Sequence, residues 1–402
     1  MRPGWIVGFL CVTVAAPLTA AAQLRVTLGE AVAIALANGP RVRLAVAEEA
    51  AARAALLTAR AWPNPTASLT YSKAVPSYHV TIDQPLEFPW LRASRIRAAR
   101  AGAAGAVYRL EMERAAVAFS VDSAYVHAAA TARLAALSAR TAQEGAELVW
   151  VARVRRDAGD ASDLDVELAI LTQGGLENTA MTDSLDAIAA LLGLQAVMGL
   201  PSVAPLIVLA DSLELLAAEP PPGPAAAVVS LRTAAAELQV DSQRAALAQE
   251  RAARIPAPGV MVGVEWHDPS QKGALPTFGL SIPLPFFDRN RGPIAAAQAA
   301  VARAQIELET ARREGAAAVA AAQAGRDAAR LRVQRNLALL EHARRAVDLT
   351  VRGYREGAFP ITTVIDTQRT ARDVLRQQVL DLEALRMATS GLARAQRVGS
   401  TP

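Results

Sequence analysis

The chain has 402 residues, of which 92 are alanine, 4% are aromatic and only two, Lys73 and Lys272, are lysine. This composition argues against a thick aromatic core and favours closely spaced helices, because alanine is small and the strongest helix former. The 42 basic and 38 acidic residues are interleaved along the chain. No basic block therefore indicates binding to nucleic acid.

Residues 1–22 are typical of a secretory signal peptide. Arg2 supplies the positive start, an apolar stretch follows, and Ala20–Ala22 form a small-residue cleavage site before Gln23. A membrane anchor needs about 20 apolar residues, whereas Pro17 interrupts this stretch. Because the one cysteine, Cys11, lies in this segment, we expect a mature protein without disulfides or cysteine chemistry.

Residues 23–200 are predicted to form a first structural unit. A helical stretch ends at a pair of prolines, two short alternating segments predict strands, and two helices follow. The polar loop between the strands contains Lys73. In order, the expected elements are Leu28–Ala61, 68–72, 78–83, Arg92–Asp157 and Ser162–Gly199.

Residues 201–224 are predicted to be a linker, residues 225–398 a second unit with the same order of elements, and residues 399–402 a tail. Two prolines at 63 and 65 return at 256 and 258, Gln84–Phe88 returns as Ile282–Phe286, and Asp157–Asp160 returns as Arg355–Ala358. Three matching segments that occur in the same order in both halves indicate a duplication. The expected elements of the second unit are Ala225–Arg254, Val260–His267, Phe278–Ile282, Gly292–Glu356 and Ile361–Arg397.

No stretch after the signal peptide has the pattern of a membrane-spanning helix. The nearest candidate, Ala187–Ala210, lacks charged residues but contains Pro201 and Pro205. Proline removes a backbone hydrogen bond that a helix in lipid needs. A chain of this kind crosses a membrane, if it does so, as strands.

The two long helices must pack along their sides, because 65 residues extend about 98 Å at 1.5 Å per residue. Apolar residues recur every seven positions in the second of them, which indicates a coiled-coil seam. Gly159 and Gly357 are expected to reverse the chain into the helices that follow. The residues of the expected seam are Ile294, Val301, Leu308, Val333, Leu337, Leu340 and Val347.

The four strands need partners from other copies. Four strands with one apolar face are not stable alone in water, and the smallest single-chain membrane barrels have eight. Three copies would supply twelve strands and close the edges, so a trimer is the simplest solution, with two and four copies still open. A soluble sandwich with an aromatic core is the alternative.

Strand alternation divides the predicted barrel residues into two groups. The lipid-facing residues would be Val260, Val262, Val264, Leu280 and Ile282. The residues facing water in the lumen would be His79, Thr81, Asp83, Glu265 and His267. Tyr71, Tyr78, Trp266 and Phe278 lie toward the hairpin ends, where an aromatic belt is expected.

The ordered duplication resembles the family of TolC-like outer membrane efflux proteins over nearly the whole mature chain. The segment Ile282–Gly292 is similar to the cobalt-zinc-cadmium-type branch that serves heavy-metal cation pumps. The resemblance implies a mainly α fold with a small β part: a homotrimer with a 12-stranded barrel in outer membrane lipid, continued by a helical barrel in the periplasm. It implies a passive exit duct for exported solutes, either heavy-metal cations or drugs, that works with a periplasmic membrane-fusion adaptor and an inner-membrane pump of the RND type.

The resemblance also places the periplasmic entrance at the two helix turns. The matching residues are Gly159 and Asp165 after the first long helix, and Tyr354, Gly357 and Asp366 after the second. A carboxylate just past each turn, repeated around a trimer, would favour cations in a narrow pore. The alternative is that Asp165 and Asp366 are charges favoured at helix N-termini.

The sequence departs from the family pattern at Phe359 and Thr363, where members often carry an arginine and a second aspartate. The resemblance therefore does not carry over the usual locking pairs of the entrance.

No catalytic or metal site stands out. The chain has no GxxxxGK, HExxH or GxSxG motif, so we predict that it is not an enzyme and uses no cofactor. His79 and His267 are expected to line the pore rather than bind a metal, and His127 and His342 to be ordinary helix residues. Four arginines near the membrane end are expected to form a solvated helix face: Arg92, Arg95, Arg97 and Arg100.

A second hypothesis is a periplasmic adaptor or a coiled-coil structural protein of an export complex. An adaptor should show one helical hairpin flanked by the halves of a glycine-rich β domain, whereas this sequence predicts two complete units of strands and helices.

Overall fold

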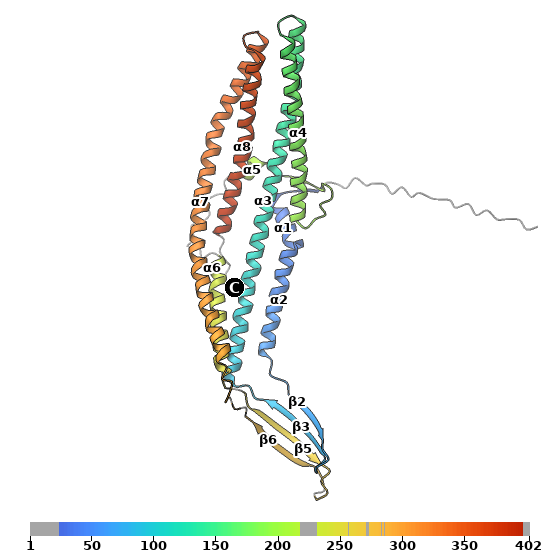
Figure 1. The fold of residues 1–402 in the computed structure, drawn as a ribbon, viewed down its shortest axis with the longest axis vertical. Helices are drawn as coiled ribbons and strands as arrows, with labels where there is room; N and C mark the ends of the chain where they lie inside the picture. The colour runs from blue at the N-terminus through green and yellow to red at the C-terminus, as the bar shows by residue number, and fades with distance from the viewer. Residues whose placement is uncertain are drawn as a thin grey trace, which may run out of the picture.

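The computed structural model describes residues 24–217, 231–255, 257–270, 273–282, 284 and 286–396. These residues form an elongated molecule whose long helices run between a small sheet at one end and two helix turns at the other (Figure 1). The predicted signal peptide, the tail and part of the predicted linker lie outside the described residues. Helices predominate and the strands are short, so the predicted mainly α fold with a small β part is confirmed.

The elements up to the first helix turn and its return helix are β1 (Leu24–Val26), α1 (Leu28–Asn38), α2 (Pro40–Arg60), β2 (Thr66–Tyr71), β3 (Tyr78–Pro85), α3 (Pro89–Asp157) and α4 (Asp163–Val197). The remaining elements are β4 (Ile207–Leu209), α5 (Leu213–Ala217), α6 (Leu231–Ala252), β5 (Gly259–Trp266), β6 (Leu275–Ser281), α7 (Arg291–Arg355) and α8 (Ile361–Ala395).

Each long helix packs against shorter helices along its length. Helix α3 packs against α4 near the turns and against α2 and α6 near the sheet, while α7 packs against α8 near the turns and against α6 near the sheet (Figure 1). Helix α4 is also long and apolar enough to cross a membrane by length and composition, which the sequence reading did not anticipate. Because α4 lies along α3, we assign it to the helical body.

One predicted helix was wrong. The stretch Leu28–Ala61 is two helices, because Gly39 and Pro40 interrupt it. Pro40 is the first residue of α2, where its missing N–H needs no partner. A side chain at position 39 would collide with the carbonyl oxygen of Ala35, so glycine is required at this break.

The seam of α7 follows the predicted heptad spacing except at one residue. Val333 is buried and Leu340 half-buried, but Leu337 is 56% exposed. Spacing of three then four residues puts Asn336, not Leu337, in the intermediate position. Asn336 points to α8, where its amide donates to the Asp381 carboxylate.

Small residues allow the paired helices to approach closely. A Cβ at Gly145 of α3 would lie 2.8 Å from the Leu176 side chain and 3.6 Å from the Gln173 backbone, both on α4. Alanines are buried along α3, α4 and α7, among them Ala130, Ala152, Ala169, Ala304, Ala311 and Ala329. These contacts give the alanine-rich composition a structural reason.

A small two-stranded sheet around the middle of α3 was not predicted. Strand β1 pairs in parallel with β4, which lies within the predicted linker. The buried Tyr125 hydroxyl of α3 donates to the Val26 carbonyl at 2.8 Å, and burial raises the pKa of this phenol. The fully buried Gln195 amide fixes the linker by donating to the Pro201 and Ala204 carbonyls at 2.6 and 3.0 Å.

The four remaining strands form one antiparallel sheet in the order β2-β3-β5-β6. Val80 pairs with Leu69 and Val264, and His79 pairs with Thr70 and Glu265. Because neighbouring residues on a strand point to opposite faces, this register collects apolar side chains on one face and polar side chains on the other. The apolar face contains Leu69, Tyr71, Tyr78, Val80, Ile82, Val260, Val262, Val264, Trp266, Phe278 and Leu280.

The junction between the sheet and the helices corrects another prediction. Arg92 and Arg95 were expected on a solvated face, but both bind carbonyl groups at the end of α2. Arg92 donates to the Arg60 carbonyl at 2.7 Å, and Arg95 donates to those of Ala59 and Ala61 at 3.1 and 2.9 Å. Carbonyl groups at a helix C-terminus lack helical partners, which is why cations gather there.

Candidate functional site

Two helix turns lie at the end of the molecule opposite the sheet (Figure 1). The first tip, residues 158–162, joins α3 to α4, and the second tip, residues 356–360, joins α7 to α8. Gly159 and Gly357 have left-handed φ angles of 82° and 79°. Glycine reaches this conformation without the steric cost that other residues meet. The prediction that the chain reverses at these two glycines is confirmed.

The same backbone hydrogen bond closes both tips. The N–H of Asp160 donates to the Arg155 carbonyl at 2.8 Å, and the N–H of Ala358 donates to the Gly353 carbonyl at 2.7 Å. Both pairs of positions differ by 198 in the sequence numbering, which is the offset of the predicted duplication.

The first tip ends in a polar cap. The Ser162 hydroxyl accepts from the N–H of Asp165 at 3.2 Å, and the Asp165 carboxylate accepts from the N–H of Ser162 at 3.0 Å. This reciprocal arrangement satisfies two backbone donors that would otherwise lack partners. The contact supports a role for Asp165 at the helix N-terminus, and its role in a pore stays a prediction.

Asp366 has a different environment. It is exposed on α8, and its carboxylate forms no hydrogen bond or ion pair with another residue in the described part of the chain. Its charge is therefore free to act on ions in the solvent near the second tip.

The second tip is closed by an apolar contact. Pro360 precedes α8 and provides no side-chain cap. The Phe359 ring lies against Gly353 of α7, and a Cβ at position 353 would overlap this ring. Phe359, one of the two departures from the family pattern, therefore fits a glycine on its own hairpin.

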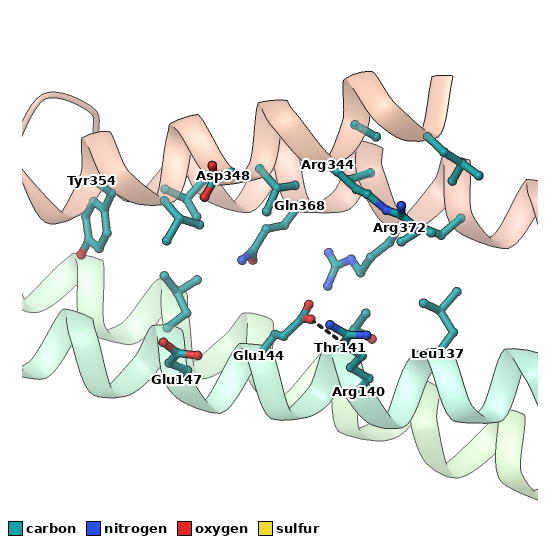
Figure 2. A pocket seen from close by; sticks show the side chains of 18 of the residues that line it. Leu137, Arg140, Thr141, Glu144, Glu147, Arg344, Asp348, Tyr354, Gln368 and Arg372 are labelled. Atoms are coloured by element: carbon teal, nitrogen blue, oxygen red, sulfur yellow. Dashed lines mark hydrogen bonds and ion pairs between the residues drawn. The ribbon is translucent and has the colours of Figure 1, made fainter. Parts of the chain in front are cut away.

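Tyr354 belongs to a small core shared by the two hairpins. Its side chain is buried and packs with residues from α3, α4, α7 and α8, and Figure 2 shows it pointing toward α3 and α4. Burial raises the pKa of this phenol, the Arg155 charge opposes that rise, and the Asp165 charge adds to it. The hydroxyl has no hydrogen-bond partner in the described chain. The core comprises Leu148, Val149, Ala152, Val166, Ala169, Tyr354, Ile361 and Val364.

Arg155, in the last turn of α3, contacts both hairpins near their tips. Its guanidinium donates to the backbone carbonyl of Tyr354 on α7 and, at 3.0 Å, to that of Asp160 in the first tip. The same group lies 4.6 Å from the centre of the Tyr354 ring, within range of a cation–π interaction. The sequence did not single out Arg155 as a site residue. At the 198-residue offset its position corresponds to Gly353, so the two units carry different residues at this place in the fold.

A groove of about 490 Å³ separates the hairpins below the tips, between α3 on one side and α7 and α8 on the other. Figure 2 shows the side chains of Arg344 and Arg372 reaching into it from α7 and α8, opposite Arg140 and Glu144 of α3. Arg140 pairs with Glu144 at 3.3 Å. Burial lowers the pKa of the Arg372 guanidinium.

Below the groove, three charged residues of α8 join the hairpins. Arg376 binds the buried Asp183 of α4 at 2.6 Å, and Arg386 binds Asp122 of α3 at 2.8 Å. Glu383 contacts the His127 ring of α3 at 2.9 Å. The hairpins are thus connected at the tips and again along α8, with the groove between these two zones. His127 has a partner in the other hairpin, which the sequence did not indicate.

The polar face of the sheet brings together most of the residues predicted for the lumen. His79 and Glu265 are directly paired across β3 and β5, and their side chains approach to 3.3 Å. Thr81 and Asp83 share this face by register. His267 lies just past β5 with a φ of 73°, and its ring is edge-on to Tyr78 on the apolar face. The structure therefore does not bring His267 to the other four residues.

The predicted lipid-facing residues lie together. Val260, Val262, Val264 and Leu280 share the apolar face, and Ile282 directly follows β6. The exposed fraction of Leu280 is 65% and that of Phe278 is 76%. Near the hairpin ends, the Tyr78 and Trp266 rings stack with their centres 5.7 Å apart, and the Tyr71 ring lies tilted against Tyr78 with a centre distance of 5.1 Å.

The described residues contain no group of three or more histidine, cysteine, aspartate or glutamate side chains that could hold a metal ion. The paired His79 and Glu265 supply two potential ligands, fewer than a resident transition metal normally has.

Comparison with known proteins finds a matching family model, curated relatives and similar solved structures. A family model described as outer membrane efflux protein matches residues 228–396. The nickel-cobalt-cadmium resistance protein NccC of Alcaligenes xylosoxydans xylosoxydans is 30% identical over 299 residues, which cover 70% of this chain and 66% of that protein. The nickel and cobalt resistance protein CnrC of Cupriavidus metallidurans is 28% identical and covers 69% of this chain and 68% of that protein.

The chain thus spans about two thirds of the length of these curated relatives. Among solved structures, that of CusC, described in connection with transmembrane channel formation, has a TM-score of 0.77 at 16% identity and covers 92% of each chain. At this identity the similarity shows the fold alone.

Proposed function

We propose that this chain, which belongs to the outer membrane efflux protein family, forms the outer membrane exit duct of a tripartite efflux system. The duct would conduct solutes passively from an inner-membrane pump of the RND type and a periplasmic adaptor to the outside. Its strands would lie in the outer membrane and its helices in the periplasm.

The observation that carries this proposal is the two-faced sheet at the end of two long helical hairpins. Its apolar face is bare in the single chain, and its polar face carries His79, Thr81, Asp83 and Glu265. Exposing such a face to water would be unfavourable by about 25 cal/mol per Å² of apolar surface. Lipid on one side and a water-filled lumen on the other satisfy both faces.

The free edges of the sheet are best accounted for by a homotrimer. The sheet has two free edges, β2 and β6, and its four strands cannot close a barrel alone. Three copies give twelve strands, and pairing β6 of one copy with β2 of the next removes every edge. The six hairpins of the trimer would then continue the barrel as a helical tube.

An adaptor fits the fold less well. The chain has two helical hairpins of similar length, α3–α4 and α7–α8, and one antiparallel sheet built from both halves. One hairpin flanked by a divided β domain, expected of an adaptor, is not what the described residues form.

Heavy-metal cations are the proposed cargo class. The support is the nickel, cobalt and cadmium named for the relatives, together with the exposed Asp366 carboxylate near the second tip. Carboxylates repeated around a narrow opening attract cations. The pump selects the cargo, so the duct needs only to favour positive charge.

Membrane fractionation and planar bilayers test the duct. The purified full-length protein should be extracted from the outer membrane by detergent as a trimer, and it should form ion-conducting channels in a bilayer. Recovery in the soluble periplasmic fraction would contradict the proposal.

Asp366→Asn tests the entrance charge. Removing the free carboxylate should reduce the preference of the channel for cations, measured as a shift of reversal potential in a salt gradient. Asp241→Asn is the matched control, because this exposed carboxylate lies on α6, away from the tips (Figure 1). Equal cation selectivity of the wild type and Asp366→Asn would show that Asp366 does not contribute to the selectivity of the pore.

A further inference from the structure

The polar face of the sheet has charges of one sign. Strands β2, β3, β5 and β6 contain no lysine or arginine. The ionisable side chains that these strands place on the polar face are His79, Asp83 and Glu265. Two of the three are carboxylates, so the face has a negative formal charge at neutral pH. This charge attracts cations to the face without selecting one cation from another.

On this face the register places a histidine directly opposite a carboxylate. Nδ1 of His79 lies 3.3 Å from Oε1 of Glu265. A charge-assisted hydrogen bond is normally about 2.7–2.9 Å long, so this contact is not a tight hydrogen bond. Neither side chain has a second hydrogen-bond or ion-pair partner among the described residues. The backbone pairing thus holds an imidazole and a carboxylate side by side, with acceptor atoms available to a cation.

The separation of these two atoms matches that of neighbouring ligands on one metal ion. Histidine nitrogen and carboxylate oxygen bind a transition metal at about 2.0–2.2 Å. Two such atoms at an angle of about 90–110° on the ion lie roughly 3.0–3.4 Å from each other. The observed 3.3 Å falls in this range. An ion could therefore bind to both groups without a change in the pairing of β3 with β5.

The chemistry of the pair favours one class of cation. Imidazole nitrogen is a good ligand for divalent nickel, copper and zinc, whereas Mg²⁺ prefers oxygen ligands and keeps its bound water. Each of the two side chains is 28% exposed, so an ion can reach them from the polar face. Two protein ligands leave the remaining coordination positions to water, and binding is therefore weak. Weak binding suits a conducting pore, because the ion must also leave.

We propose that His79 and Glu265 form a transient binding site for divalent transition-metal cations in the lumen of the barrel. The proposal rests on the duct function proposed above, and it names a contact between the duct wall and its cargo. Strand β3 begins at Tyr78 and β5 ends at Trp266, so the pair lies one residue from the hairpin ends. These ends are the part of the molecule farthest from the tips (Figure 1). An exported ion would reach the site last, and a trimer would offer three copies of it.

Planar bilayers containing the full-length trimer, purified without a histidine tag, test this site. Ni²⁺ or Mg²⁺ is added on the side of the hairpin ends, and the block of the potassium current is measured. The two ions have the same charge, so only coordination distinguishes them. Ni²⁺ should give half-block at a concentration about tenfold lower than Mg²⁺. His79→Gln and Glu265→Gln should each lower this ratio about fivefold, because each removes one ligand of the pair.

Two control variants separate coordination from charge. His267→Gln makes the same substitution at a histidine whose ring lies edge-on to Tyr78 on the apolar face, and it should keep the wild-type ratio. Asp83→Asn removes a carboxylate from the polar face about 13 Å along β3 from His79. It should weaken the block by both ions alike and leave their ratio unchanged. An equal fall of the ratio in His79→Gln and His267→Gln would contradict the proposal.

Titration calorimetry of the detergent-extracted trimer with Ni²⁺ separates this proposal from the duct function. If the wild type forms no channels but binds Ni²⁺ more strongly than His79→Gln does, the duct function fails and the site remains. If the wild type conducts and His79→Gln keeps both its Ni²⁺ binding and its ratio of block, the site is overturned. If His79→Gln does not assemble, Glu265→Gln decides in its place, and wild-type Ni²⁺ binding by that variant would equally overturn the site.

Discussion

The two tips have nearly the same backbone and different chemistry. Their glycines differ by 3° in φ, and the same backbone hydrogen bond closes each turn. The first tip is completed by Ser162 and Asp165, whereas the second is completed by Phe359 on Gly353. The geometry of a helix reversal requires glycine, but the groups that cap it are free to change.

Because of this difference, the two tips are stabilised by different kinds of contact. The cap of the first tip consists of hydrogen bonds exposed at the surface, each worth about 1 kcal/mol or less in net stability. The contact of the second tip covers only part of the Phe359 ring, which stays 43% exposed, and it depends on the shape of the ring against Gly353. We therefore expect the second tip to tolerate substitution less well than the first.

The largest effect should come from Gly353→Val. The new side chain would overlap the Phe359 ring, and overpacking of this kind costs about 1–3 kcal/mol. The midpoint of thermal unfolding of the detergent-extracted trimer should fall. Gly391→Ala is the control, since nothing lies within 4 Å of a Cβ there. Gly353→Val combined with Phe359→Ala should recover much of the loss, and no recovery would show that the clash is not the cause.

The glycines of the turns should respond alike. Gly159→Ala and Gly357→Ala each place a side chain in the left-handed region, at a cost of roughly 1–2 kcal/mol. Because the φ angles match, chemical denaturation should give similar losses for the two variants. A loss confined to one glycine would mean that the tips are not equivalent in backbone strain.

The smallest effect should come from Ser162→Ala. It removes the hydroxyl that accepts from Asp165, and loss of such a cap costs about 1 kcal/mol. Thr363→Ala is the matched control: position 363 corresponds to Asp165 at the 198-residue offset, and its side chain makes no cap in the second tip. Equal melting temperatures for Ser162→Ala and the wild type would contradict the capping role.

The sequence was informative wherever one local pattern decides the structure. Alternation identified both faces of the sheet, and glycine between two long helices identified both turns. Helical periodicity located the seam of α7 but placed it one residue too far at Leu337, because a period of 3.6 does not distinguish positions three and four residues apart without the partner helix.

Contacts between distant segments were harder to predict. Strands β1 and β4 are three residues each and pair across more than 180 positions, so neither has a pattern of its own. Arg92, Arg95 and Arg155 resemble ordinary surface arginines in sequence, yet all three bind backbone carbonyl groups of another helix. Backbone acceptors have no residue-type signature, which is why these contacts could not be read from the sequence.

The parallel pairing of β1 with β4 has a consequence for the order of assembly. The segment beginning at Leu24 pairs with Ile207–Leu209, so a chain emerging from its N-terminus must hold its earliest strand unpaired until some 180 further residues have followed. Non-local pairings form slowly because loop closure comes before any contact is gained. The middle of the tube is therefore expected to be completed late, after each helical hairpin has already formed from its own neighbouring segments.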